Sequence, residues 1–299
     1  MPGELNDAIA AYLHALQAAK GRGAQTVANY RLYLQRFVAA TGATMISQFT
    51  PQTVEQFRLW LRRDGDVLLR TPTINYHLTA LRGLAAYLRT AGRPVLAPEQ
   101  IRLEPMPSRQ PRRVETPGIN KLLELPFKLE GRALQQHRDR AILELLCTTG
   151  VRVGELSRLR RDSITADGST LAIVSRGNRV RTVPLGNQAR YWIERYLKLR
   201  VDGAPQLFVR HDPAARTAGR AKRTAPAGLT PRSVQRLVQK YARAAGLGKT
   251  VQPRVLRHTV AASLVEAGND LETVRTRLGH ASLATTKRYL PPRKKAADD

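Results

Sequence analysis

The chain of 299 residues carries 50 lysine and arginine residues against 23 aspartate and glutamate residues, which gives a formal net charge of +27. A protein with this imbalance repels itself unless a polyanion is its partner, and nucleic acid is the usual one. The length suggests two domains, and a hydrophobic content of 42% excludes a disordered chain. The single cysteine, Cys147, excludes an intramolecular disulfide and a cysteine-cluster metal site.

The chain contains no apolar run close to the roughly 20 residues that a membrane helix needs. Its N-terminus also lacks a basic region followed by an apolar stretch, so we predict no signal peptide, no membrane contact and a cytoplasmic location. A ribosomal or nonspecific nucleic-acid-binding protein would share this composition. The residue patterns along the chain therefore have to separate these classes.

Residues 1–101 show the apolar spacing of three or four positions that is typical of helices. A first helix is expected at 5–19, and Thr26 is expected to cap a second. Pro51 and Pro72 stand where the first turns of a third and a fourth helix would lie. No strand-like alternation interrupts this pattern, which predicts a compact helical domain. With a net charge of +27, we expect its exposed arginines to face DNA.

Residues 102–117 are rich in proline and arginine and poor in apolar residues, which predicts an extended linker. A basic linker of this kind can follow a phosphate backbone while the two flanking domains contact opposite sides of a duplex. We place the second domain at residues 118–299.

The second domain combines helical spacing with two short β-type runs, which predicts a mainly α fold with a small antiparallel β-sheet. An apolar helix is expected at 139–149, stopped by Gly150. Residues 175–179 are expected to form the tip of a hairpin, and the basic segment 203–228 is interpreted as a mobile loop. The other predicted elements are strands at 171–174 and 180–185 and helices from about 153 and at 231–245, 253–267, 271–278 and 283–290.

Four stretches of the second domain resemble the catalytic domain of tyrosine recombinases, the phage integrase family, and in particular its Xer-like members. They are TTGVRVGELSRL (148–159), SRGNRVRTVPL (175–185), QPRVLRHTVAASLVEAG (252–268) and LGHASLATTKRYL (278–290). The stretch TPTINYHLTALRGLAAYL (71–88) resembles that family's SAM-like core-binding domain. Each motif alone is weak, but the four occur in the family's order and approximate spacing, and the likeness covers nearly the whole chain.

The resemblance implies a site-specific DNA recombinase or integrase that cuts and rejoins DNA through a 3′-phosphotyrosine intermediate. A phenolic oxygen can conserve the phosphodiester energy in a covalent link, and arginines can neutralise the charge that develops on the phosphate oxygens. The resemblance also implies double-stranded DNA as the partner and a homo- or hetero-tetramer on two DNA sites. It implies strand exchange without ATP, metal or cofactor.

Within these motifs, Tyr289 matches the family's nucleophile, and Arg152 and Arg257 match its two catalytic arginines. His280 lies nine residues before Tyr289 and matches the late histidine that hydrogen-bonds a phosphate oxygen. Glu155, three residues after Arg152, falls on the same helical face and resembles the supporting acidic residue. From the residues alone, simpler interpretations stay open: a packing tyrosine, surface arginines, a histidine that caps a helix, and a glutamate that favours a helix start.

Two positions depart from the family's pattern. Arg176 stands where the family has a hairpin lysine, regarded as the general acid for the leaving oxygen, and arginine releases a proton poorly. Arg254 stands where the H-x-x-R motif has histidine. It can stabilise phosphate charge but cannot readily accept the tyrosine proton. His258 is interpreted as structural, because it directly follows Arg257 and adjacent helix positions face different ways.

These departures leave a second hypothesis open, a catalytically impaired DNA-binding protein on the same scaffold. It predicts salt-dependent, site-selective binding with no covalent adduct and no gain from Arg176→Lys. Relaxation of supercoils through the same intermediate, as in a type IB topoisomerase, is a third interpretation.

Overall fold

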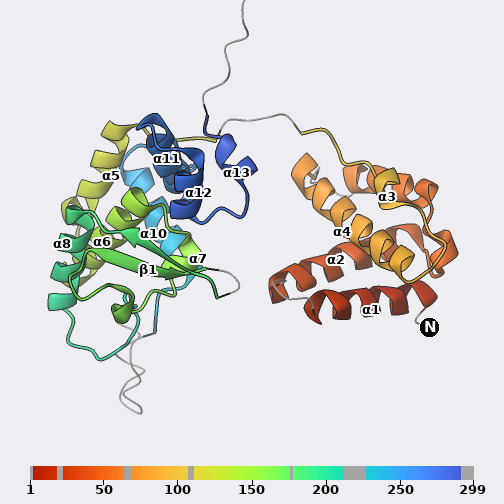
Figure 1. Cartoon of the computed structure of the whole chain (residues 1–299), viewed down its shortest axis with the longest axis horizontal. Helices are drawn as coiled ribbons and strands as arrows, with labels where there is room; N and C mark the ends of the chain where they lie inside the picture. The colour runs from red at the N-terminus through yellow and green to blue at the C-terminus, as the bar shows by residue number, and fades with distance from the viewer. Residues whose placement is uncertain are drawn as a thin grey trace, which may run out of the picture. The chain divides into compact units, whose positions relative to one another are not determined.

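The structure is a computed structural model that describes residues 3–18, 23–63, 69–106, 111–175, 178–211 and 227–290. The chain divides into two compact units, an N-terminal unit (Met1–Ser108) and a C-terminal unit (Arg109–Asp299), and each is described by itself (Figure 1). Helices dominate both, and the sheet among the described residues has two antiparallel strands, so the predicted fold class is confirmed. No helix in the described part of the chain is long and apolar enough to cross a membrane.

The N-terminal unit packs its helices around one apolar core. Its elements are α1 (Glu4–Ala18), α2 (Ala24–Thr41), η1 (Ile46–Gln48), α3 (Pro51–Arg63), α4 (Thr71–Thr90) and η2 (Pro98–Gln100). The buried ring of Phe37 meets Phe49 and Phe57 edge-on, with ring centroids 5.5 and 5.3 Å apart, which joins α2 to α3. The N-cap of α2 is Gly23 without a side-chain cap, so the predicted cap at Thr26 is wrong.

Both units hold residues of the segment for which the sequence predicts a linker. Glu104 pairs with Arg58 and Arg62 at 3.0 and 2.6 Å, and its backbone N–H donates to Asn75 at 2.7 Å, all within the N-terminal unit. Val114 is buried in the core of the C-terminal unit. The contacts of each unit therefore reach into residues 102–117.

The C-terminal unit is built around α6, against which α5, α8 and α11 pack (Figure 1). Its elements are α5 (Thr116–Lys128), α6 (Ala133–Thr149), α7 (Val153–Leu156), η3 (Arg161–Ser163), β1 (Thr170–Val174), β2 (Val180–Pro184), α8 (Asn187–Lys198), α10 (Pro231–Ala244), α11 (Pro253–Glu266), α12 (Leu271–Leu278) and α13 (Leu283–Lys287). Leu143, Leu145 and Leu146 of α6 are fully buried although they point in different directions. A helix that is apolar on several faces is expected at the centre of a domain.

The bounds or the presence of some helices of this unit were not predicted from the sequence. The central helix begins at Ala133 rather than at Asp139, because its polar first turns are held by tertiary contacts. Arg138 donates to the carbonyl of Val209 at 3.1 Å and pairs with Asp139 at 2.7 Å. Neither α5 nor α8 was identified, and α5 contains Pro126, a residue type that usually ends a helix.

The predicted hairpin is confirmed, since β1 and β2 pair antiparallel with Leu171 opposite Val183. Leu171, Ile173 and Val183 are buried, while Val174 and Val180 are exposed. The period-two alternation of the strands therefore places one face of the hairpin on the core.

The predicted mobile loop at 203–228 is wrong in its first part. Leu207, Phe208 and Val209 are buried in the core. The backbone here also bridges Arg160 with Gln206 and Val209 with Gly228. The remainder of this prediction, at 212–226, lies outside the described residues.

The last helix is shorter than predicted. The spacing predicts a helix through residue 290, but α13 ends at Lys287 and Arg288 is its C-cap. Tyr289 therefore lies in the turn that follows, with its backbone N–H donating to the carbonyl of Thr286 at 3.0 Å.

Candidate active site

A cavity of about 370 Å³ in the C-terminal unit brings together residues from three of the four motifs. We call it the tyrosine cavity. Its lining residues are Val151, Arg152, Val153, Pro253, Arg254, Arg257, His258, His280, Thr285, Arg288 and Tyr289. Five of the predicted site residues are thus neighbours, Glu155 lies behind Arg152, and Arg176 lies outside the described residues. The hydrogen bonds of each of these side chains show how the fold positions that side chain.

Arg257 joins the ends of two helices. Its guanidinium donates to the carbonyls of Gly150 and Leu278, both at 2.7 Å, where α6 and α12 end and helix dipoles favour a cation. Gly150 has φ 61°, and a Cβ there would meet the Leu278 side chain at 2.9 Å, so glycine is required. Burial lowers the pKa of Arg257 to about 10, and the charge of Arg152 adds to the effect. Arg257 therefore remains a cation at neutral pH.

Arg152 is the more accessible of the two predicted catalytic arginines. It is the N-cap of α7 and pairs with Glu155 at 2.9 Å, while its Nη2 donates to the carbonyl of Gly279. Its side chain remains 41% exposed, whereas the Arg257 residue is 8% exposed. Arg152 can therefore meet a ligand that enters the cavity.

Arg181 on β2 is a third arginine of this network, and it was not predicted from the sequence. Its Nη1 and Nη2 donate to the two carboxylate oxygens of Glu155 at 2.9 and 2.8 Å. Burial, the largest single influence, raises the pKa of Glu155, but hydrogen bonds from Arg181 and Arg152 outweigh it and lower the pKa to about 2. Arg181 could have been found, because it is two residues before buried Val183 and so shares its face of the strand.

The hydroxyl of Tyr289 lies in the cavity and hydrogen-bonds to Nδ1 of His258. The tyrosine ring also stacks on His280, with centroids 6.2 Å apart and planes 15° apart. His258, which was interpreted as structural from the sequence, is therefore the direct partner of the predicted nucleophile.

The surroundings of Tyr289 act on its pKa in opposite directions. Burial raises the pKa of the phenol, and the positive charges of Arg257, Arg288 and Arg254 lower it, with a net rise. To bring the pKa of Tyr289 back to its ordinary value, the phenolate needs a further stabilisation, which a hydrogen-bond donor to its oxygen can provide.

Both histidines of the cavity are neutral at neutral pH. Burial lowers the pKa of His258 to about 4, assisted most by the charge of Arg254. Burial also lowers the pKa of His280 to about 4, assisted most by Arg257. Nδ1 of His280 lies 2.8 Å from the hydroxyl of the buried Thr286, which fixes the ring in the cavity wall.

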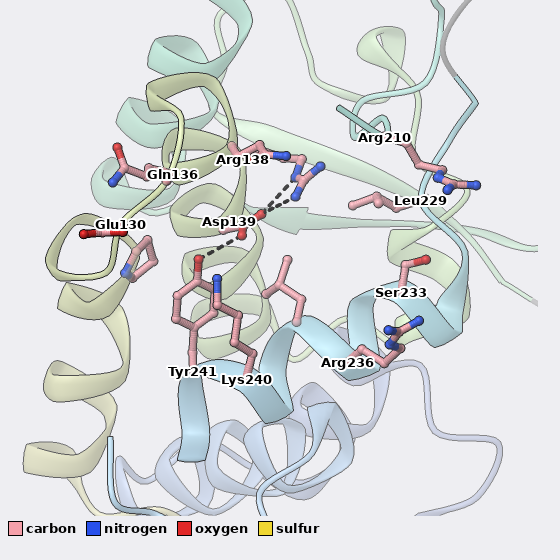
Figure 2. A pocket seen from close by; sticks show the side chains of 14 residues that line it. Glu130, Gln136, Arg138, Asp139, Arg210, Leu229, Ser233, Arg236, Lys240 and Tyr241 are labelled. Atoms are coloured by element: carbon pink, nitrogen blue, oxygen red, sulfur yellow. Dashed lines mark hydrogen bonds and ion pairs between the residues drawn. The ribbon is translucent and has the colours of Figure 1, made fainter. Parts of the chain in front are cut away.

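A second cavity, of about 490 Å³, lies between the start of α6 and α10, and we call it the α6–α10 cavity. Figure 2 shows Tyr241 pointing at Asp139, to which its hydroxyl donates at 2.9 Å. Burial and the charge of Asp139 raise the pKa of Tyr241, so this phenol keeps its proton. Arg138 pairs with the same carboxylate. The two cavities share no lining residue.

Comparison with known proteins identifies the family to which the chain is similar. The model of the phage integrase family matches residues 115–295, and the model of the phage integrase N-terminal SAM-like domain matches residues 9–92. Tyrosine recombinase XerC of Pelobacter propionicus is 32% identical over 291 residues, which cover 95% of this chain and 90% of XerC. Tyrosine recombinase XerD of Listeria innocua is 30% identical over 294 residues, which cover 95% of this chain and 94% of XerD.

Solved structures share the fold. The XerH site-specific recombinase bound to a palindromic difH substrate matches with a TM-score of 0.71 and 21% identity, over 96% of this chain and 83% of XerH. A lambda integrase dimer bound to a COC′ core site matches with a TM-score of 0.70 and 16% identity, over 99% of this chain and 79% of the integrase. Because the family model covers more than half of the chain and the XerC relative matches along nearly its whole length, the chain belongs to the phage integrase family of tyrosine recombinases.

Proposed function

We propose that this site-specific DNA recombinase cuts a DNA strand by attack of Tyr289 on the scissile phosphate. The bond between the phenolic oxygen and phosphorus forms as the bond to the 5′-oxygen breaks, which leaves a 3′-phosphotyrosine link and a 5′-hydroxyl. The observation that supports this role is the tyrosine cavity, in which Tyr289, Arg152 and Arg257 line one space.

The proposed roles of the other residues follow from their contacts. Arg152, partly exposed, binds a non-bridging phosphate oxygen, and Arg257 adds a fixed positive charge. His280 donates a hydrogen bond to the phosphate. Glu155 orients Arg152, with Arg181 as a second partner of the same carboxylate. Preorganised donors of this kind stabilise the transition state because they need no rearrangement during the reaction.

The partner is double-stranded DNA, as the net charge of +27 favours. We further propose that four protomers, identical or of two kinds, assemble on two DNA sites, because exchange must hold two duplexes together while their ends are transferred. Mass photometry of the protein with duplexes that carry one or two sites tests this assembly. A complex that never exceeds two protomers on two-site DNA would contradict it.

The decisive experiment looks for the covalent adduct. Duplexes that bind selectively are first recovered from a random-sequence library. Each is then prepared with a nick in the cleaved strand just 3′ of the scissile phosphate, so that the short fragment with the freed 5′-hydroxyl diffuses away and religation fails. Incubation should give a protein–DNA adduct that survives heating in detergent. Digestion and mass spectrometry should find the nucleotide on Tyr289.

Two outcomes separate this proposal from the impaired DNA-binding protein. An adduct on Tyr289 supports cleavage, whereas selective binding without any adduct contradicts it. Arg176→Lys tests the leaving-group step: a faster cleavage indicates an active site limited by its proton donor, because lysine releases a proton more readily than arginine.

A further inference from the structure

Three side chains form a relay that ends on the phenolic oxygen of Tyr289. Arg254 and His258 are one helical turn apart on α11, and Nε of Arg254 donates to Nε2 of His258 at 3.2 Å. Nδ1 of the same imidazole meets the hydroxyl of Tyr289. Both ring nitrogens of His258 are therefore engaged.

The hydrogen bond that Arg254 donates to His258 decides whether His258 donates to Tyr289 or accepts from it. A guanidinium has only donors and keeps its charge, so Nε2 of His258 must accept and cannot carry a proton. A neutral imidazole has one N–H, which must then lie on Nδ1. The hydrogen bond between His258 and Tyr289 consequently runs from the imidazole to the phenolic oxygen.

We propose that Arg254 fixes His258 in the tautomer protonated on Nδ1, and that His258 donates this hydrogen to the phenolic oxygen of Tyr289 and stabilises the attacking phenolate. The inference rests on the proposed role of Tyr289 as nucleophile. His258 is then a catalytic residue that touches the reacting atom. Arg254 is a positioning residue that acts through His258.

The proton balance differs from that of a general base. Tyr289 loses its hydroxyl proton to a solvent water, and His258 keeps its own proton throughout. The phenolate oxygen then attacks phosphorus as the bond to the 5′-oxygen breaks. A hydrogen bond to the charged form of a group favours ionisation, so the donor offsets the burial of the phenol. A histidine that accepted the tyrosine proton would need a bare Nδ1, which the contact with Arg254 disfavours.

The charges around His258 keep the imidazole in its neutral form. Arg254 and Arg257 face it from α11, Arg288 faces it from the end of α13, and the neutral His280 lies across the cavity. Burial is the first cause of the lowered pKa of His258, and all three arginines act in the same direction. With a single ring proton, the partner of Nε2 alone selects the tautomer.

The kinetic experiment compares His258→Asn with His258→Ala on a nicked duplex whose scissile 5′-oxygen is replaced by sulfur. Sulfur leaves without a proton, so the rate of adduct formation reports the nucleophile alone. The amide of asparagine can donate near the position of Nδ1 but is not basic. We expect His258→Ala to lower the rate about ten- to a hundredfold, the usual effect of one hydrogen bond to a charged group. His258→Asn should recover most of the rate that His258→Ala loses, whereas the control His137→Asn on α6 should match the wild type.

The part of Arg254 is tested by the protonation of Tyr289 in the DNA-free protein. The absorbance of tyrosinate, taken as the difference from Tyr289→Phe, gives the pKa of Tyr289 at each substitution. Arg254→Met should raise that pKa and Arg254→Lys should restore it, because lysine is also only a donor. Spectra of ¹⁵N-labelled histidine, assigned with His258→Asn, should show His258 protonated on Nδ1, and Arg254→Met should shift the population towards Nε2.

The outcomes separate this inference from the proposed function. An adduct on Tyr289 that forms as slowly in His258→Asn as in His258→Ala overturns the donor role while the nucleophile stands. An Nε2-protonated His258 in the wild type overturns the relay directly. If the wild type forms no adduct with either oxygen or sulfur substrates, the proposed function itself fails.

Discussion

Two tyrosines of the C-terminal unit, Tyr289 and Tyr241, each place a hydroxyl against an ionisable side chain, but the charges around the two hydroxyls act on the pKa in opposite directions. Tyr241 donates to the carboxylate of Asp139, and the negative charge adds to burial in raising its pKa. Tyr289 meets a neutral imidazole, with Arg257 among the charges that lower its pKa. Burial raises the pKa of both phenols, and the charge of the neighbours either adds to this rise, at Tyr241, or opposes it, at Tyr289.

The arginines of the two cavities differ in the same way. The guanidinium of Arg138 pairs with Asp139, so its charge is largely cancelled. That of Arg257 donates to the neutral carbonyls of Gly150 and Leu278. Helix ends can thus hold a cation without a carboxylate, which keeps its charge available for a phosphate.

The sharpest test of this comparison is a pair of matched substitutions. Tyr289→Phe should abolish the covalent adduct, because no oxygen remains to attack phosphorus. Tyr241→Phe, which removes a hydroxyl from the other cavity, should leave the adduct rate of the folded protein unchanged. Denaturing gels of nicked-duplex reactions measure both. An adduct that survives in Tyr289→Phe would assign the nucleophile to another residue.

The arginine pair should give the next largest effect. Arg257→Ala should slow adduct formation about 10²–10³-fold, the usual loss when one donor to the developing charge is removed. Arg138→Ala, scaled to the fraction of folded protein, should not slow it. Single-turnover rates at saturating protein separate this effect from weaker DNA binding. Equal losses for the two variants would show that Arg257 acts only through folding.

Glu155 predicts a pH-dependent stability. Its pKa is lowered from 4.5 to about 2, so its stabilising contribution is present above pH 4.5 and is lost as the pH falls towards 2. At about 1.4 kcal/mol for each pKa unit, Glu155→Gln should destabilise the protein by about 3 kcal/mol at pH 7. Urea unfolding followed by circular dichroism should show the gap between wild type and variant closing with acidification. A gap that is independent of pH would contradict the ionised Glu155 network.

The smallest expected effect is on stability in the α6–α10 cavity. Tyr241→Phe leaves one oxygen of Asp139 without its buried donor, which should cost about 1–3 kcal/mol. Thermal unfolding of the whole chain measures this change. The comparison of the two tyrosines predicts that a stabilising ligand or lower temperature restores full cleavage in Tyr241→Phe but never in Tyr289→Phe.

Local patterns predicted much of the fold. The spacing of apolar residues indicated the helices of the N-terminal unit, and the alternation around 171–185 indicated the hairpin. The same rules failed where the buried residues are polar, and where a residue that usually ends a helix lies inside one. The polar residues Arg138 and Asp139 made the start of α6 look unlike a buried helix, and Pro126 is a residue type that usually ends a helix. Both helices form because tertiary hydrogen bonds and packing outweigh the intrinsic helix propensities of these residues.

The candidate site shows a similar division. Tyr289, Arg152, Arg257 and His280 were predicted from motifs that keep the family's order, and they line one cavity. Arg181 and His258 were not assigned a role in the site. Their importance depends on the carboxylate and the hydroxyl that reach them from other elements, and separations along the chain do not report those distances.

The sequence by itself determined that this chain is a basic, mainly helical member of the phage integrase family, because composition and motif order can be read directly from the order of the residues. Only the tertiary structure decided which hydrogen bonds each side chain makes. The tautomer proposed for His258 is the clearest case, since it follows from the contact of Arg254 with Nε2 of the ring. Proton positions depend on partners brought together by folding, and a linear pattern contains no such partners.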